Sequence, residues 1–300
     1  MANNELTVAI LGPGGVGGLL AALLARAGNR VICLAGPETA ASLRDNGIQV
    51  RSAQFGDFTA RVAADTELRE PVDACLIAVK HTALAAALDR VPAESLGDGL
   101  LVPLLNGVEH PALLRSRYRP DRVSPGIIRV ESTRVAPGVI EHASPFAEID
   151  LTGEAVPESG LKSLADALSE AGPTVRILGN EAAALWAKMS FLAPFALLTT
   201  RYAVPLGEIR AEHGDELTAL VAETVAVARA HDAPIDAAQV LARYNAFPPE
   251  AKSSMQRDAE AGHPLELDAI GGALLRAADS RNIAVPVATR LVQELQARLP

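Results

Sequence analysis

A glycine-rich segment near the start of the chain constrains the fold more than any other feature. The aliphatic run Leu6 to Leu11 leads directly into Gly12-x-Gly14-x-x-Gly17, and strong helix formers follow. A buried parallel strand, a glycine turn and a helix, in this order, are typical of a dinucleotide-binding unit. The first glycine permits a tight turn, the second lets backbone approach a pyrophosphate, and the third lets the helix pack against the strand.

This turn predicts the first contacts of a bound dinucleotide. Gly12, Gly14, Gly15, Val16 and Gly17 should surround the pyrophosphate, which also meets the positive end of the helix dipole. The alternative is a tight strand-to-helix turn that binds no ligand.

Composition excludes several classes of protein. With 49% hydrophobic residues in a chain of 300, a substantial core and one or two domains are expected, and disorder is excluded. The formal net charge of −9 argues against a general nucleic-acid binder. The six histidines are scattered without paired spacing, so no metal site is expected.

The cysteines and the apolar runs bear on location. Cys33 and Cys75 fall inside predicted strands and have no metal-type spacing, which is typical of small buried hydrophobes in a reduced, cytoplasmic protein. No apolar run approaches the ~18 residues that a membrane span requires. We therefore expect a protein of the cytoplasm that does not interact with a membrane.

The pattern of elements changes along the chain. Strands are expected over 6–11, 30–35, 71–79, 100–105 and 174–178, two short ones within 48–64, and antiparallel ones over 127–135, 138–143 and 147–152. Helices after the first are expected over 41–46, 84–91, 157–172, 181–202, 215–231, 237–244, 265–281 and 287–298. The prediction is α/β: a Rossmann domain with an antiparallel extension over 1–179, followed by an all-α domain over 180–300.

Three positions follow predicted parallel strands, where such sheets bind ligands. Lys80 and Asn106 could contact cofactor or substrate, although a solvent lysine and an Asn-Gly turn residue are the alternatives. Gly36 follows the second strand, where an acid would favour NAD and an arginine NADP. The missing acid disfavours NAD mildly, and the missing arginine leaves no argument for NADP. Arg44 could reach a 2′-phosphate or could simply lie on a solvated helix face.

Two charged residues stand on apolar helix faces. Lys188 shares a face with Leu192 and Ala196, and an ammonium there must reach water, find a partner or line a cleft. Pro194, a turn further on, should kink this helix and open space beside Lys188. Glu266 stands at the start of the apolar face of a later helix and could pair with Lys188. The alternative is that it is there only because the helix dipole favours a carboxylate in the first turn.

Two adjacent hydroxyls precede the Glu266 helix. Ser253 and Ser254 could bind an anion or cap a helix.

Taken together, these motifs resemble the ketopantoate reductase family (2-dehydropantoate 2-reductases) over almost the whole chain. The matching segments are Gly12-x-Gly14-x-x-Gly17, Val79-Lys80, Asn106-Gly107, Leu185-Trp186-x-Lys188, Ser253-Ser254-Met255-x-x-Asp258 and Leu265-Glu266-Leu267-Asp268. The resemblance implies NADPH-dependent reduction of a 2-oxo acid in a cleft between a Rossmann and a helical domain.

The resemblance also implies residue roles. Lys188 would be the general acid, and Glu266 would orient the substrate or the lysine. Asn106 and Lys80 would hold cofactor and substrate, and Ser254 would contact the substrate carboxylate. An ammonium suits its role because it both stabilises a developing alkoxide and supplies the proton.

Three positions depart from the family pattern. Leu192 and Ala196 stand where the family has asparagines that bind polar substrate groups, which predicts a more apolar 2-oxo acid or related carbonyl compound. Gly36 replaces the usual arginine, so NADP rests on the resemblance and NAD is not excluded.

Two other functions stay open: another β-hydroxyacid or imine-type dehydrogenase of related fold, and a non-catalytic NADP(H) sensor. The retained Lys188 and Glu266 speak against the sensor, which needs no proton donor. The expected partner is a small-molecule 2-oxo acid, and a homodimer is compatible with the sequence. The substrate could belong to pantothenate biosynthesis, although the sequence does not identify a pathway.

Overall fold

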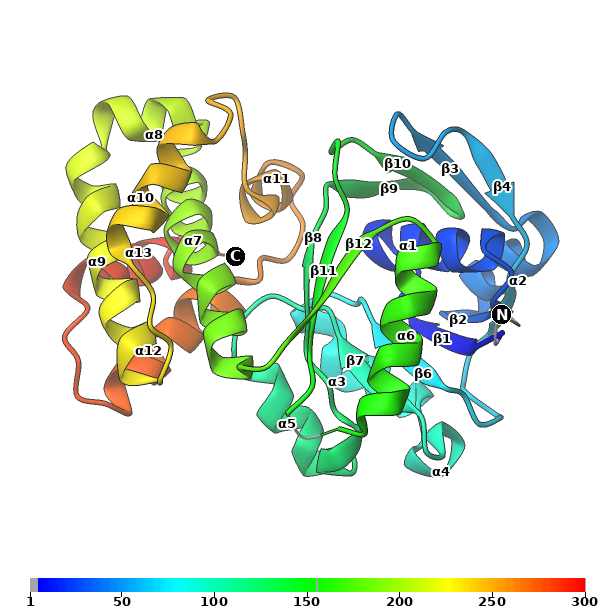
Figure 1. Cartoon of the computed structure of the whole chain (residues 1–300). Helices are drawn as coiled ribbons and strands as arrows, with labels where there is room; N and C mark the ends of the chain where they lie inside the picture. The colour runs from blue at the N-terminus through cyan, green and yellow to red at the C-terminus, as the bar shows by residue number, and fades with distance from the viewer. Residues whose placement is uncertain (1–4, 155, 300) are drawn as a thin grey trace. The chain divides into compact units, whose positions relative to one another are not determined.

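The computed structural model describes residues 5–154 and 156–299, and the chain divides into two compact units. The first unit comprises the chain up to Leu105 together with His110–Glu181. The second comprises Asn106–Glu109 and the chain from Ala182 onward. Figure 1 shows strands and helices mixed in the first unit and helices throughout the second, which confirms the predicted fold class.

A parallel sheet of five strands, in the order β5-β2-β1-β6-β7, is the centre of the first unit. Its strands are β1 (Thr7–Leu11), β2 (Arg30–Leu34), β5 (Ala63–Asp65), β6 (Ala74–Ile77) and β7 (Leu100–Pro103). All but two residues of β1 and β2 are buried, since helices cover a parallel sheet on both faces. Cys33 and Cys75 are buried and free, as predicted, and burial raises the pKa of each thiol to about 12.

The predicted antiparallel strands are present, but the strand expected over 127–135 is divided into two, and the strands of this region belong to two different sheets. One sheet has the order β4-β3-β10-β9 and the other the order β12-β11-β8. Their strands are β3 (Ile48–Ser52), β4 (Phe58–Ala60), β8 (Gly126–Arg129), β9 (Ser132–Ala136), β10 (Val139–His142), β11 (Glu148–Thr152) and β12 (Thr174–Leu178). Only the pairs β3–β4, β9–β10 and β8–β11 are antiparallel, whereas β10 pairs parallel to β3 and β11 parallel to β12.

Helix α1 (Gly15–Arg26) lies between two of these sheets. It packs on β1 and β2 from one side and on β3, β9 and β10 from the other, as Figure 1 shows. The remaining helices of this unit are α2 (Pro37–Asn46), α3 (Leu84–Ala87), α4 (Ala93–Leu96), α5 (His110–Arg117) and α6 (Glu158–Glu170). The prediction was too short for α2 and missed α5. The helix predicted over 84–91 is α3 followed by a 3₁₀ turn, Leu88–Arg90.

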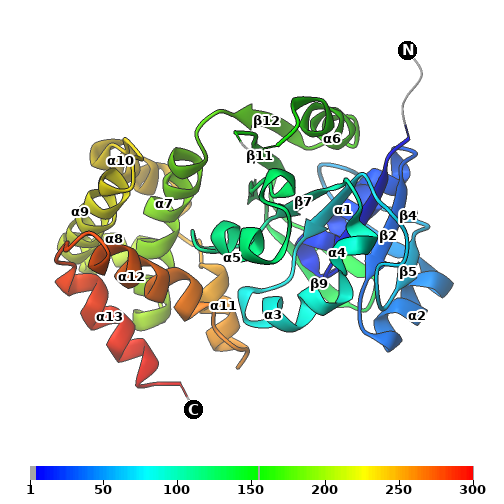
Figure 2. The ribbon, with the colours of Figure 1, turned by 90° about the horizontal axis from the view of Figure 1, so that it is seen from below.

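The second unit is built around α7 (Glu181–Tyr202), whose ends match the prediction. The other helices, visible in Figure 2, are α8 (Leu206–Glu212), α9 (Gly214–Ala230), α10 (Ala237–Ala246), α11 (Ser254–Glu260), α12 (Ala273–Asp279) and α13 (Pro286–Gln296). A π-helical turn, Asp268–Gly272, precedes α12, so the single regular helix predicted over 265–281 is wrong. Helices α8 and α11 were not predicted, and α7 continues as helix past Pro194.

Helix α7 also corrects the expectation about apolar runs. Its 22 residues are long and apolar enough to cross a membrane by length and composition alone. However, 72% of the apolar window is buried within the protein, as in the core helix of a soluble domain. Trp186, Met189, Leu197 and Leu198 of α7 belong to the core of the helical unit.

A buried carboxylate in β11 ties its sheet together. Asp150, about 3% exposed, forms ion pairs with Arg176 at 2.6 Å and with Arg129 at 2.8 Å. Burial alone would raise the pKa of Asp150, but the two guanidinium groups outweigh it and lower the pKa. The resulting stabilisation is complete above the ordinary carboxyl pKa of 3.8 and is lost as pH falls through the lower pKa of the folded protein.

We expect Asp150→Asn to lower the free energy of unfolding by about 1–3 kcal/mol at pH 7, because two charge-assisted contacts to a buried carboxylate are lost. Urea unfolding followed by circular dichroism measures this change. The control is Glu141→Gln, which removes an exposed ion pair with Arg51 and should cost about 0.5 kcal/mol or less. An equal loss of unfolding free energy in the two variants would contradict the stabilising role of Asp150.

Candidate functional site

The glycine turn of the first unit has the geometry of a dinucleotide site. Gly12 has a φ of +86°, and a Cβ there would lie 2.5 Å from the side chain of Val79. A Cβ on Gly17 would lie 2.3 Å from the carbonyl oxygen of Gly12. Only glycine therefore allows α1 to begin directly against the end of β1.

Gly14 differs from its neighbours because the space beside it is open. No atom lies within 4 Å of the position that its Cβ would take. Gly14 is also the residue before α1, where the first backbone N–H groups of the helix have no partner within it. Half-buried Val16 follows in the first turn. Open space beside unpaired N–H groups fits a bound pyrophosphate.

Gly15, also predicted to contact the pyrophosphate, packs closely against a strand that is distant in sequence. A Cβ on Gly15 would lie 2.1 Å from the carbonyl oxygen of Ser132 in β9, and Ser132 Oγ donates a hydrogen bond to Gly15 O at 2.9 Å. This position has no room for a side chain, because β9, which is distant in sequence, packs on the start of α1. No local signal could have identified this contact.

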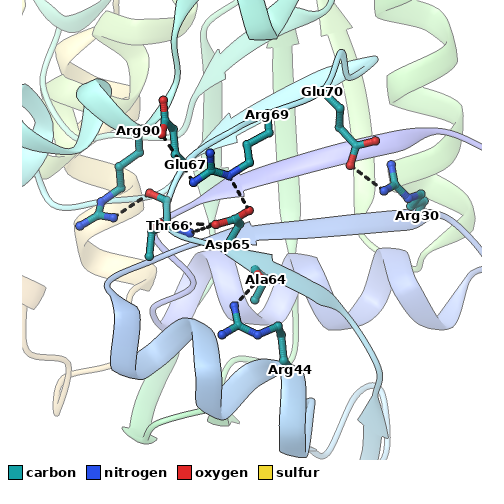
Figure 3. A network of polar contacts seen from close by, with 9 residues as sticks. All are labelled: Arg30, Arg44, Ala64, Asp65, Thr66, Glu67, Arg69, Glu70 and Arg90. Atoms are coloured by element: carbon teal, nitrogen blue, oxygen red, sulfur yellow. Dashed lines mark hydrogen bonds and ion pairs between the residues drawn. The ribbon is translucent and has the colours of Figure 1, made fainter.

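Figure 3 shows the arginines near β2 and β5. Arg44, in the last turn of α2, donates a hydrogen bond from Nη1 to the backbone carbonyl oxygen of Ala64 at 2.8 Å. Arg90 donates from Nη1 to the carbonyl oxygens of Ala35 and Thr66, at 3.0 and 2.7 Å. Sequence reasoning missed Arg90, which belongs to no motif.

Lys80 is the remaining predicted site residue of the first unit. It is exposed, stands shortly after β6 and directly precedes a 3₁₀ turn. This is the carboxyl edge of the parallel sheet, as predicted from the order of strands.

In the second unit, Asn106 and Glu266 are in contact although 160 residues separate them. Asn106 Nδ2 donates to Glu266 Oε2 at 3.0 Å, and Glu266 is only 8% exposed. Glu266 stands just before the π-helical turn rather than inside a helix. A buried carboxylate needs such a partner because desolvation of its charge is costly.

The segment that carries Asn106 is held against this turn. Gly107 has a φ of +92°, and a Cβ there would lie 2.4 Å from the carbonyl oxygen of Ala269. Arg276 pairs with both Glu109 and Asp268 at 2.7 Å, and these carboxylates raise its pKa. Asn106 is therefore an Asn-Gly turn residue and also a fixed hydrogen-bond donor.

The face of α7 predicted to meet a substrate is mostly apolar. Lys188 and Leu192 are half-buried, and Ala196 is fully buried. Further along, Thr199 Oγ1 lies 2.8 Å from Ser253 Oγ. This contact joins α7 to the start of α11 and was not predicted.

The two adjacent serines have different surroundings. Ser253 is buried and caps α11 by accepting a hydrogen bond from the backbone N–H of Gln256 at 3.1 Å. Ser254 is exposed, so its hydroxyl can meet a small anion from solution. Ser253 is therefore a helix cap, whereas anion binding remains a hypothesis for Ser254.

A matched pair of substitutions tests the glycine turn. We expect Gly14→Ala to keep the melting temperature within about 2 °C, because its Cβ enters open space, yet to weaken dinucleotide binding about 10-fold or more. Gly17→Ala should instead lower the melting temperature by about 4 °C or more, because its Cβ meets backbone. Calorimetry and nicotinamide fluorescence measure the two effects. Unchanged affinity in Gly14→Ala would count against a pyrophosphate beside this residue.

Comparisons with known proteins agree with this architecture. Residues 8–152 match the family model "Ketopantoate reductase PanE/ApbA", and residues 180–299 match "Ketopantoate reductase PanE/ApbA C terminal". A 2-dehydropantoate 2-reductase of Mycobacterium tuberculosis (strain CDC 1551 / Oshkosh) is 30% identical over 97% of both chains.

Two solved structures are also similar. The 2-dehydropantoate 2-reductase from Methylococcus capsulatus has a TM-score of 0.87 at 28% identity and covers 97% of this chain and 96% of its own. D-Mandelate dehydrogenase with NADH and anilino(oxo)acetate has a TM-score of 0.88 at 21% identity, with 97% and 98% covered, and shares the fold. At about 30% identity to its relatives, the chain belongs to the ketopantoate reductase family as a divergent member.

Proposed function

We propose that this oxidoreductase reduces a 2-oxo acid to the 2-hydroxy acid with NADPH, and that Lys188 is the general acid. Membership of the family supports reduction of a 2-oxo acid. The observation that carries the proposal is the hydrogen bond between Asn106 and buried Glu266, since a core gains little from a buried carboxylate. Such a pair is expected where a reacting group must be positioned.

The chemistry assigned to the chain is proton transfer and positioning. When bound, the reduced nicotinamide supplies a hydride to the substrate carbonyl carbon. Lys188 Nζ donates a proton to the carbonyl oxygen and stabilises the negative charge that develops there. Asn106 fixes the carboxylate of Glu266, which orients the substrate or the lysine.

The other site residues have binding roles in this proposal. The pyrophosphate lies against the glycine turn, which consists of Gly12, Gly14, Gly15, Val16 and Gly17. Lys80 and Asn106 hold cofactor and substrate, and Ser254 contacts the substrate carboxylate.

The substrate side chain is proposed to be apolar. Leu192 and Ala196 offer no hydrogen bond, and Ala196 is fully buried on α7. A hydroxylated 2-oxo acid would leave its hydroxyl without the amide partners that it needs. The anilino(oxo)acetate bound by D-mandelate dehydrogenase is itself a 2-oxo acid derivative with an aryl group, which favours a mandelate-type dehydrogenase as the second candidate.

NADPH is the reductant that the family resemblance implies, whereas the D-mandelate dehydrogenase structures contain NADH. The proposed chemistry is the same with either, because the two dinucleotides differ only in the 2′-phosphate. We further propose a cytoplasmic protein, since both cysteines are free and buried. Assembly as a homodimer is part of the same proposal.

Lys188→Ala should lower kcat by about 10²–10⁴-fold, the usual contribution of a general acid, and should leave NADPH affinity within about 3-fold. Steady-state absorbance of the nicotinamide measures kcat, and fluorescence titration measures binding. The control Lys162→Ala removes an exposed lysine paired with Asp166 and should change neither value. Turnover at the wild-type rate in Lys188→Ala would exclude the assigned role.

A panel of 2-oxo acids tests the substrate class. We expect kcat/KM for 3-methyl-2-oxobutanoate and phenylglyoxylate to exceed that for ketopantoate about 10-fold or more. Leu192→Asn should narrow this ratio because it introduces an amide on the Lys188 face of α7. Efficient reduction of ketopantoate by the wild-type protein, comparable with that of the apolar acids, would refute the altered specificity.

A further inference from the structure

The carboxyl end of β2 is where a dinucleotide domain distinguishes NADPH from NADH. In this fold an acid near the strand end binds the ribose 2′-hydroxyl, or an arginine nearby accommodates the 2′-phosphate. Here β2 ends at Leu34 and is followed by Ala35, Gly36 and Pro37, which carry no charge. A group elsewhere in the chain must therefore decide the choice.

Gly36 leaves this position accessible to a ligand. No atom lies within 4 Å of the position that its Cβ would take, so the space beside the strand end is open. Its φ of −63° and ψ of 159° are ordinary for any residue, so no backbone constraint requires glycine. Pro37 then begins α2 without an N–H, so it cannot donate a hydrogen bond to an anion.

Arg90 brings a positive charge to the same place from a distant part of the sequence. Its Nη1 binds the carbonyl oxygen of Ala35, the residue next to Gly36, and that of Thr66, just after β5. Figure 3 shows the Arg90 side chain reaching across to Thr66. Two carbonyl acceptors hold a half-buried guanidinium in one place, so little side-chain entropy is left to lose when a ligand binds.

The donors of Arg90 suit a phosphate. Nη1 donates both of these hydrogen bonds, which leaves Nη2 and Nε, two donors on one edge of the planar guanidinium group. An edge of this kind binds phosphate oxygens in a bidentate manner. Because both bonded partners are neutral carbonyl groups, they leave the charge of the guanidinium uncompensated.

The other arginines in Figure 3 are less suited to this role. Arg69 and Arg30 are paired with the carboxylates of Asp65 and Glu70, at 3.1 and 2.6 Å. Arg30 also begins β2 and so lies at its opposite end. Arg44 stands in the last turn of α2, remote from Gly36 at the start of that helix.

Acidic groups near the strand end make a cation necessary for a phosphate. Glu38 stands in the first turn of α2, and Asp65 ends β5. The backbone N–H of Thr66 and the side chain of Arg69 compensate Asp65 and lower its pKa. A 2′-phosphate would meet the uncompensated charge of Glu38 unless a guanidinium lay between them.

We infer that Arg90 binds the 2′-phosphate of NADPH and replaces the arginine that the strand end lacks at Gly36. The inference rests on the proposed function, because it assumes that the glycine turn holds a nicotinamide dinucleotide. Arg90 is then the residue that sets cofactor preference, and Gly36 provides the space that the phosphate enters.

Arg90→Gln tests this role by direct binding. We expect its Kd for NADPH, from nicotinamide fluorescence, to rise about 10- to 100-fold, while its Kd for NADH changes by no more than about 3-fold. Arg90→Lys should keep part of the NADPH affinity, because it retains the charge without the fork. Gly36→Arg in the Arg90→Gln background should restore NADPH binding, since a new guanidinium enters the same open space.

The matched control is Arg44→Gln, which removes another arginine bound to a backbone carbonyl in the same network. Its two Kd values should match those of the wild type. Equal weakening of both dinucleotides in Arg90→Gln would show a merely structural role, and a loss of NADPH preference in Arg44→Gln would transfer the role to that residue. Tighter binding of NADH than of NADPH by the wild type would also overturn the inference. Failure of the wild type to bind either dinucleotide would instead overturn the proposed function.

Discussion

The close approach of α1 to β1 is the constraint on which the first unit depends. Gly17 lies so near Gly12 that any side chain would overlap backbone, and the left-handed conformation of Gly12 turns the chain within a few residues. The first turn of α1 therefore begins at the carboxyl edge of the sheet. The N–H groups of this first turn, which have no partner within the helix, then lie next to the open space beside Gly14, where an anion can be bound.

In the second unit, charged side chains stand on elements that are otherwise mostly apolar. Helix α7 is largely core, yet it carries half-buried Lys188. Glu266 is buried, stands two residues before the π-helical turn in the sequence, and accepts a hydrogen bond from Asn106. Both charges stand on elements fixed by packing, so their side chains can be held in defined positions.

Local patterns predicted the elements whose formation is local. The β1–turn–α1 unit and the bounds of α7 agree with the structure because their hydrophobic and glycine patterns are continuous in sequence. The division of the antiparallel strands between two sheets was not predicted, because strand pairing is a long-range choice. Residues 132–136 pair with β10, whereas residues 126–129 pair with β11, and no local pattern separates these partners.

The candidate site shows the same contrast between local sequence features and long-range contacts. Asn106, Lys188, Ser254 and Glu266 were noticed in the sequence, and the resemblance to a known family implied their roles. The bond between Asn106 and Glu266 spans 160 residues, and Arg90 reaches Ala35 across 55. Sequence alone determined the fold class and the chemical groups available, since these follow from composition and short-range periodicity. Only the tertiary structure decided which groups meet, because that depends on how distant segments pack.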